Sequence, residues 1–219
     1  QFFESRRFPY GVRATITDAS ASRLKEIVRF FRANCPSLEQ LHVEPVWYCG
    51  RCRTSGARPP GNEAFLHTFL DAMDDAAKLG IRLFYSGARL DAITNKFCAA
   101  PGDGFSVTPE GIASSCFEVT EASDPRASLF HYGRYDADEG RFVFDAERLR
   151  KLRELTVEKI PHCGDCFCKW HCGGDCLAKV MTGRDAASHH GSPRCEVNRA
   201  ITFAEIRRIV DGAQGGESH

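Results

Sequence analysis

The sequence predicts an α/β protein, because its first half alternates strand-like and helix-like segments and its second half combines a hairpin signal with many cysteines. Of its 219 residues, 42% are hydrophobic and 26% are charged, which is typical of a globular protein and excludes a disordered one. Eleven residues are cysteine, and seven of them lie from Cys116 to Cys195. The length allows one large domain or two small ones.

Residues 11–95 predict the order strand, helix, strand, helix, strand. The three strand-like runs are rich in β-branched and apolar residues and occupy 12–17, 41–44 and 81–84. Apolar residues recur three and four apart between these runs, so two helices are expected, the first capped by Asp18 or Ser20 and the second by Asn62. This order implies parallel strands with right-handed crossovers, in a small sheet or part of a barrel.

The remaining residues predict a region of different character. Residues 105–107 and 112–114 flank Thr108-Pro109-Glu110-Gly111, where the positions of proline and glycine suit a type I turn, so a β-hairpin is expected. The polar stretch 120–140 is expected to be loop. Asp145 is expected to cap a helix, and a last helix is expected over 198–210.

Charge and targeting signals narrow the expected partners. The 29 Lys and Arg residues balance 29 Asp and Glu residues, so no binding to nucleic acid or to a membrane surface is expected. No apolar run approaches the ~18 residues of a membrane helix, and residues 1–10 lack the apolar core of a secretory signal. An odd cysteine count without a signal favours reduced, metal-bound thiols in the cytoplasm. The chain starts with Gln1, so we read it as a fragment.

The cysteines of the second region form a spaced series. Cys98 and Cys116 flank the expected hairpin, with Gly111 in its turn. The series continues as Cys163-x2-Cys166-x5-Cys172-x3-Cys176 and ends at Cys195. A Cys-x2-Cys pair lets two thiolates reach one metal or cluster from a single turn, and the hairpin brings two more together. The spacings alone allow either zinc or iron–sulfur.

This series of seven cysteines and one glycine resembles the SPASM motif, which marks the C-terminal extension of many radical S-adenosylmethionine (radical SAM) enzymes that modify peptides and proteins. The match covers about residues 98–195, and residues 11–95 are similar, less specifically, to the last strands and helices of the partial barrel of those enzymes. The resemblance implies a partial (β/α) barrel remnant over 1–95, followed by an α+β SPASM domain over 96–219. It also implies two auxiliary [4Fe–4S] clusters, the first held by Cys98, Cys116 and Cys176 and the second by Cys163, Cys166, Cys172 and Cys195.

The chain departs from the family pattern in three places. The sequence contains no Cys-x3-Cys-x2-Cys motif, which holds the family's radical-generating cluster, so this chain alone is not expected to cleave S-adenosylmethionine. Phe117 stands where the sulfatase-maturing branch has a catalytic Asp. The first cluster has only three matching cysteines, so its fourth position is either open to substrate or filled by another group, for which Cys168, outside the motif, is a candidate.

The resemblance therefore implies the auxiliary cluster-binding portion of an oxidoreductase, a peptide or protein maturase. Its expected partners are a peptide or protein substrate and an electron-donor protein. In the full-length enzyme Arg13 would hold the carboxylate of S-adenosylmethionine, and a strand-end salt bridge is the alternative role for this residue. The alternative functions are a zinc-stabilised cysteine-rich binding module and a standalone electron carrier.

Three cysteines of the first half lie outside the motif. Cys49 and Cys52 are either a redox or metal-binding pair or two reduced loop thiols. Cys35 is expected to be a small structural thiol.

Histidine and tryptophan residues of the second region are secondary candidates. His189 and His190 lie in a Gly/Ser-rich loop and are expected to face solvent. Trp170 and His171 lie within the cysteine series and are expected to shield a cluster from water.

Overall fold

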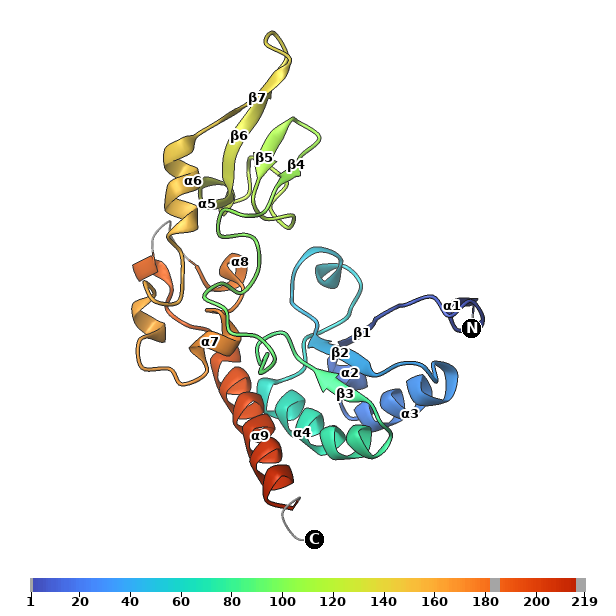
Figure 1. Ribbon diagram of the computed structural model, residues 1–219. Helices are drawn as coiled ribbons and strands as arrows, with labels where there is room; N and C mark the ends of the chain where they lie inside the picture. The colour runs from blue at the N-terminus through green and yellow to red at the C-terminus, as the bar shows by residue number, and fades with distance from the viewer. Residues whose placement is uncertain (1, 182–185, 216–219) are drawn as a thin grey trace. The chain divides into compact units, whose positions relative to one another are not determined.

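The computed structural model describes residues 2–181 and 186–215 and divides the chain into two compact units. The first unit is Gln1–Leu90 with Glu196–His219, and the second is Asp91–Cys195. Each unit combines helices with a sheet of its own, which confirms the predicted α/β class (Figure 1). The described residues form one parallel and one antiparallel sheet, both open, and no barrel.

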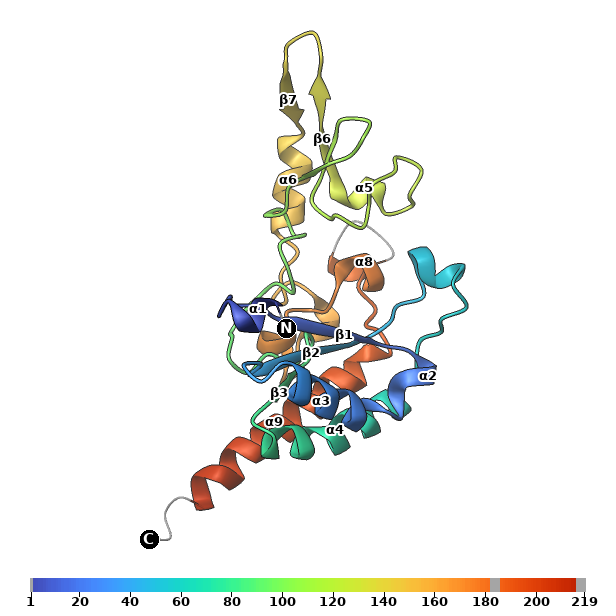
Figure 2. The ribbon, with the colours of Figure 1, turned by 90° about the vertical axis from the view of Figure 1, so that its right-hand side faces the viewer.

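The first unit is built on a parallel sheet. Its strands are β1 (Val12–Ile16), β2 (Gln40–Pro45) and β3 (Arg82–Phe84), paired in the order β1-β2-β3. Its helices are α1 (Phe2–Ser5), α2 (Asp18–Ala21), α3 (Leu24–Asn34), the 3-10 helix η1 (Gly50–Arg53), α4 (Asn62–Lys78) and most of α9 (Arg194–Gly215). Figures 1 and 2 show α3 and α4 on the same face of the sheet. The expected strand–helix order and the parallel pairing are therefore confirmed.

Side chains of this sheet alternate between a buried face and a polar face. The buried face carries Ile16, Leu41, Val43 and Leu83, which share one core cluster with Phe65 and Phe69 of α4. Arg13 and His42 have the opposite parity and are paired across β1 and β2, so they share the polar face. This polar second face is unlike that of most parallel sheets, whose two faces are both buried.

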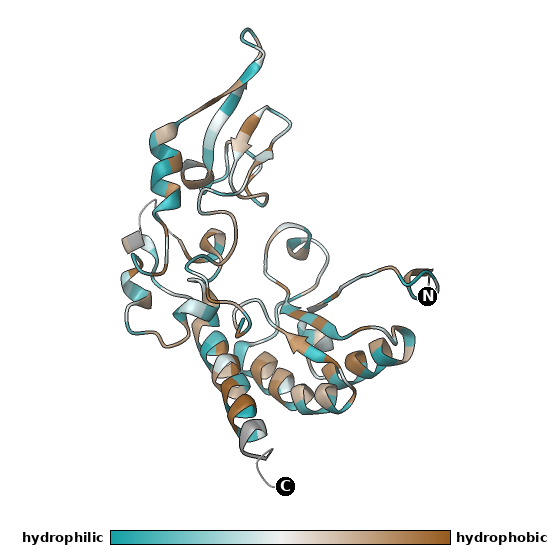
Figure 3. Cartoon of the chain, in the orientation of Figure 1, coloured by the Kyte–Doolittle hydropathy of each residue, from teal (hydrophilic) through white to brown (hydrophobic). Residues whose placement is uncertain are grey.

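The last helix belongs to the first unit. Val197 and Ile201 are buried in the first unit's core, and Arg208 pairs with Asp74 of α4 at 2.9 Å. These residues were expected in the second region, because contacts with a part of the chain so distant in sequence leave no local signal. Polar and apolar residues are interspersed along α9 (Figure 3). No helix among the described residues is both long enough and apolar enough to span a membrane.

The second unit is built on an antiparallel sheet. Its strands are β4 (Ser106–Val107), β5 (Ile112–Ser114), β6 (His131–Asp136) and β7 (Arg141–Phe144), in the order β4-β5-β6-β7. Its short helices are α5 (Ala127–Phe130), α6 (Ala146–Arg153), η2 (Pro161–Cys163), α7 (Lys169–Cys172), α8 (Leu177–Val180) and η3 (Ala186–Ser188). The expected hairpin is confirmed as β4–β5, whose turn is closed by a hydrogen bond from Gly111 N–H to the Thr108 carbonyl at 2.9 Å.

Two expectations about local structure are corrected. Residues 120–140 are not all loop, because they contain α5 and β6. The strand β6 was missed since it is short on apolar residues, yet it is held by backbone pairing to β5 on one side and β7 on the other. The helix expected after Asp18 or Ser20 begins later, as α3 after the N-cap Arg23, and Asp18 and Ser20 lie instead in the short α2, which Thr17 caps. Asp145 does cap α6, accepting a hydrogen bond from Arg148 N–H at 3.0 Å.

Candidate metal centre

One group of thiols is made of Cys98, Cys116 and Cys176. Cys116 is buried, Cys176 is partly buried and Cys98 is exposed. Burial raises the pKa of Cys116, and it raises the pKa of Cys176 to about 12. A negative charge on Cys98 raises the pKa of both thiols further. Cys98 is therefore within electrostatic range of the other two thiols.

Glycines permit the backbone approaches that bring this group together. A Cβ on Gly104 would lie 2.2 Å from the Ser115 carbonyl oxygen, so the segment after Cys98 packs directly against the residue before Cys116. A Cβ on Gly173, which has a φ of +70°, would lie 2.6 Å from the Phe97 nitrogen. Only glycine fits these two positions, because any side chain would collide with backbone.

A second group of thiols surrounds Cys163. Burial raises the pKa of Cys163 to about 11, and negative charges on Cys166 and Cys195 raise it further. Cys195 Sγ lies 3.8 Å from His162 Nε2. Cys172 is buried at the end of α7, and its N–H donates to the Cys168 carbonyl at 2.8 Å. Cys166 and Cys195 are therefore within electrostatic range of Cys163, while Cys172 is placed by the backbone of the α7 turn.

Cys168 lies beside the second group. Its Sγ is 3.4 Å from Cys166 Sγ, and its side chain is buried. This position keeps Cys168 a candidate ligand, as expected from the sequence. Its neighbour Cys166 is a predicted ligand of the second cluster. From the sequence, Cys168 was expected instead as a candidate for the fourth position of the first cluster.

A buried ion pair joins the chain segments that carry two of the cysteines. Arg194 Nε lies 3.5 Å from Asp175 Oδ2, and both side chains are almost fully buried. The Cys176 N–H donates to Asp175 Oδ1 at 2.7 Å, and the Ser192 hydroxyl donates to Asp175 Oδ2 at 3.2 Å. Sequence reasoning missed this pair. The one available signal was that each charged residue directly precedes a motif cysteine.

In the described part of the chain, the cysteine thiols are reduced and are not gathered around a single ion position. All eleven cysteines lie in the described part of the chain and are free thiols. Among residues 2–181 and 186–215, no three His, Cys, Asp or Glu side chains are close enough together to hold one metal ion.

The other predicted residues of the second unit are less closely tied to the cysteines. Phe117 is 80% exposed. His189 corrects the expectation of a solvent-facing residue, since it is 3% exposed and its Nε2 lies 2.7 Å from the Gly174 carbonyl oxygen. His190 is exposed, as expected. The Trp170 carbonyl accepts a hydrogen bond from Thr94 N–H at 2.8 Å.

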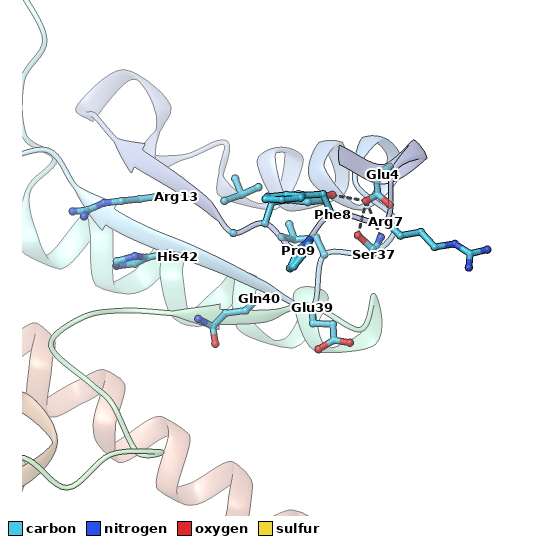
Figure 4. Close-up of a pocket in the computed structure, with 13 residues that line it drawn as sticks. Glu4, Arg7, Phe8, Pro9, Arg13, Ser37, Glu39, Gln40 and His42 are labelled. Atoms are coloured by element: carbon cyan, nitrogen blue, oxygen red, sulfur yellow. Dashed lines mark hydrogen bonds between the residues drawn. The ribbon is translucent and has the colours of Figure 1, made fainter. Parts of the chain in front are cut away.

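Arg13 lies at the edge of a groove of about 810 Å³ in the first unit. Figure 4 shows Arg13 and His42 side by side, with Glu4 hydrogen-bonded to Ser37 at the far end of the groove. The groove follows the amino ends of β1 and β2. Deeper along β2, Glu44 is buried, accepts a hydrogen bond from Ser86 N–H at 2.8 Å and pairs with His42 Nε2 at 3.0 Å.

Comparison with known proteins adds no relative. A scan against protein-family models finds no match to this chain, and a search of curated proteins finds none either.

Proposed function

We propose that the second unit binds two [4Fe–4S] clusters and that the chain is the auxiliary, SPASM-like part of a radical SAM enzyme acting on a peptide or protein. One observation carries the proposal: the segment after Cys98 packs directly against the residue before Cys116, so cysteines distant in sequence come into one region. The pKa of Cys116 and of Cys176 responds to charge on Cys98, while that of Cys163 responds to Cys166 and Cys195. Both relations fall within the ligand sets that the motif resemblance implies, the second of which also includes Cys172.

The burial of these thiols supports a metal-bound role. Burial raises the pKa of Cys163 to about 11 and of Cys176 to about 12, so a bare thiolate is strongly disfavoured at both positions. A bound cation reverses this preference, because metal ligation replaces the thiol proton. Backbone N–H groups also reach the sulfurs, from Ala100 to Cys98 at 3.5 Å and from Ser192 to Cys195 at 3.4 Å. Iron–sulfur clusters transfer single electrons, at potentials that depend on such hydrogen bonds and on burial.

The first unit has a matching proposed role. Its three parallel strands with helices on one face are consistent with the last part of a partial barrel, whose inner face would be the polar face that carries Arg13. Arg13 is exposed there and would bind the carboxylate of S-adenosylmethionine in the full-length enzyme. The proposal includes a peptide or protein substrate and an electron-donor protein as partners.

Metal analysis of the whole chain, purified without oxygen, tests the proposal. We expect brown protein with about eight irons, in two clusters of four. The double variant Cys98→Ser/Cys176→Ser should lose about half of the iron, and Cys163→Ser/Cys172→Ser the other half. Cys35→Ser is the matched control and should retain all of it. Colourless protein with about two zinc ions would support the binding module instead, and protein without metal would overturn both.

A further inference from the structure

Cys49 and Cys52 belong to neither cysteine group of the second unit. They lie in the loop of residues 46–61, which joins β2 to α4 in the first unit. The loop starts at the carboxyl end of the parallel sheet, where Val46 N–H donates to the Ile16 carbonyl at 2.8 Å. Ligands of open parallel sheets bind outside the carboxyl ends of the strands, and loops of this length are commonly functional.

The loop holds the two cysteines within reach of each other. Cys52 N–H donates to the Cys49 carbonyl at 3.1 Å, which closes a tight turn. Such a turn keeps its end Cα atoms within about 7 Å, and disulfides span Cα separations of about 4.4–6.8 Å. Gly50, with a φ of +50°, supplies the left-handed residue inside the turn. The pair can therefore be bridged with little movement of the backbone.

The two thiols differ in accessibility. Cys49 is partly exposed, whereas Cys52 is 8% exposed and its Sγ donates to the Ala57 carbonyl at 3.1 Å. An accessible thiol followed by a buried one three residues later is the arrangement that thiol–disulfide exchange requires. The first thiol meets the external disulfide, and the second is shielded from it but adjacent to the first.

The charge of the loop indicates the kind of disulfide it would meet. Residues 46–61 contain three arginines, Arg51, Arg53 and Arg58, and no Asp or Glu. Two of the arginines directly follow or precede Cys52. A uniformly cationic loop attracts anionic ligands, and glutathione disulfide carries carboxylates at both ends.

We propose that Cys49 and Cys52 form a reversible dithiol–disulfide pair that exchanges with an anionic low-molecular-weight disulfide of the glutathione type. The Cys49 thiolate attacks one sulfur of glutathione disulfide and displaces one glutathione thiolate, leaving a mixed disulfide. The Cys52 thiol loses its proton and attacks Cys49 Sγ, displacing the second glutathione. Two protein thiols are thus oxidised by two electrons with loss of two protons, and one glutathione disulfide becomes two glutathione thiols.

Peptide mapping of the whole chain tests the proposal. The Cys35→Ser protein is treated with glutathione disulfide, quenched in acid, alkylated and digested with trypsin. Trypsin cleaves after Arg32, Arg51 and Arg53, so a Cys49–Cys52 bridge joins the dipeptide 52–53 to fragment 33–51. The Cys35→Ser background removes the other cysteine of that fragment. The expected result is this linked product, in protein with or without bound iron, so the test does not depend on the proposed function.

Single variants separate the two roles. Cys52→Ser should stop at a mixed disulfide of Cys49 with glutathione, and Cys49→Ser should leave Cys52 unmodified. Arg51→Gln/Arg53→Gln should slow the release of glutathione but leave the rate with the neutral bis(2-hydroxyethyl) disulfide unchanged. Absence of the linked product, or equal glutathione attachment at Cys52 in the Cys49→Ser protein, would overturn the proposal.

Discussion

The two units are stabilised in different ways. Of the twelve largest fully buried side chains of the described residues, nine lie in the first unit, among them Phe65, Phe69 and Tyr85. The core of the second unit includes Cys116 and Cys163, with Cys176 packed against it. Both units bury apolar side chains, but the second has fewer large ones, has cysteines within its core and adds a buried ion pair and close backbone contacts. The same kind of substitution should affect the two units differently.

The largest expected effect in the first unit follows from Phe69→Ala. Phe69 is fully buried and packs against Phe65 and Tyr85, so its truncation leaves a cavity. We expect a loss of about 3–5 kcal/mol in unfolding free energy. Denaturant unfolding followed by Trp47 fluorescence in a Trp170→Phe background reports on this unit. A loss below about 1 kcal/mol would contradict a core of this kind.

Removal of one buried charge should destabilise the second unit about as much as loss of a buried ring destabilises the first. Asp175→Asn leaves Arg194 buried without its carboxylate, which should destabilise the unit by about 3 kcal/mol. Unfolding followed by Trp170 fluorescence in a Trp47→Phe background measures the change. We also expect reduced iron retention, because this carboxylate accepts the hydrogen bond from Cys176 N–H. Unchanged unfolding would mean that the pair contributes nothing to the second unit.

Gly173→Ala tests the close backbone approach beside Cys98. Both Gly173 and Gly140 have a positive φ, so alanine costs about 1–2 kcal/mol at either position. Only at Gly173 does the added Cβ meet backbone, 2.6 Å from Lys96 and Phe97, whereas at Gly140 it meets open space. Gly173→Ala should therefore destabilise the second unit more than the matched control Gly140→Ala. It should also lower iron content, and equal effects of the two variants would contradict the role given to this contact.

The raised cysteine pKa values predict a pH dependence confined to the metal-free protein. The pKa of Cys163 is raised from 9.0 to about 11 and that of Cys176 to about 12, mainly by burial. The folded state thus favours the neutral thiols, so their contribution is fully present below pH 9 and is lost as pH rises toward 12. Unfolding midpoints of metal-free protein should fall over this range. Replacing both cysteines by alanine should flatten the fall, and an unchanged slope would argue against the buried thiols as its cause.

How much the sequence predicts also differs between the units. Strands β1 to β3 were predicted because their apolar residues and intervening helices follow regular periods. The division of the cysteines into two ligand sets came only from the resemblance. The spacing alone allowed either zinc or iron–sulfur and assigned no cysteine to a set. Asp175 and Arg194 had no periodic signal, and His189 was misjudged because its burial depends on the distant Gly174 carbonyl. Contacts between irregular segments are set by tertiary packing, which local patterns do not encode.

The smallest expected effect sharpens the contrast between a buried and an exposed ion pair. Glu147 pairs with Arg150 at 2.8 Å on the surface of α6, and this partner lowers the pKa of Glu147 to about 2. Both side chains are more than half exposed, so solvent screens the attraction. Glu147→Gln removes the same charge as Asp175→Asn, within the same unit, but should barely change the unfolding midpoint followed by Trp170 fluorescence. If the two variants were equally destabilising, burial would not be what makes the Asp175–Arg194 pair important.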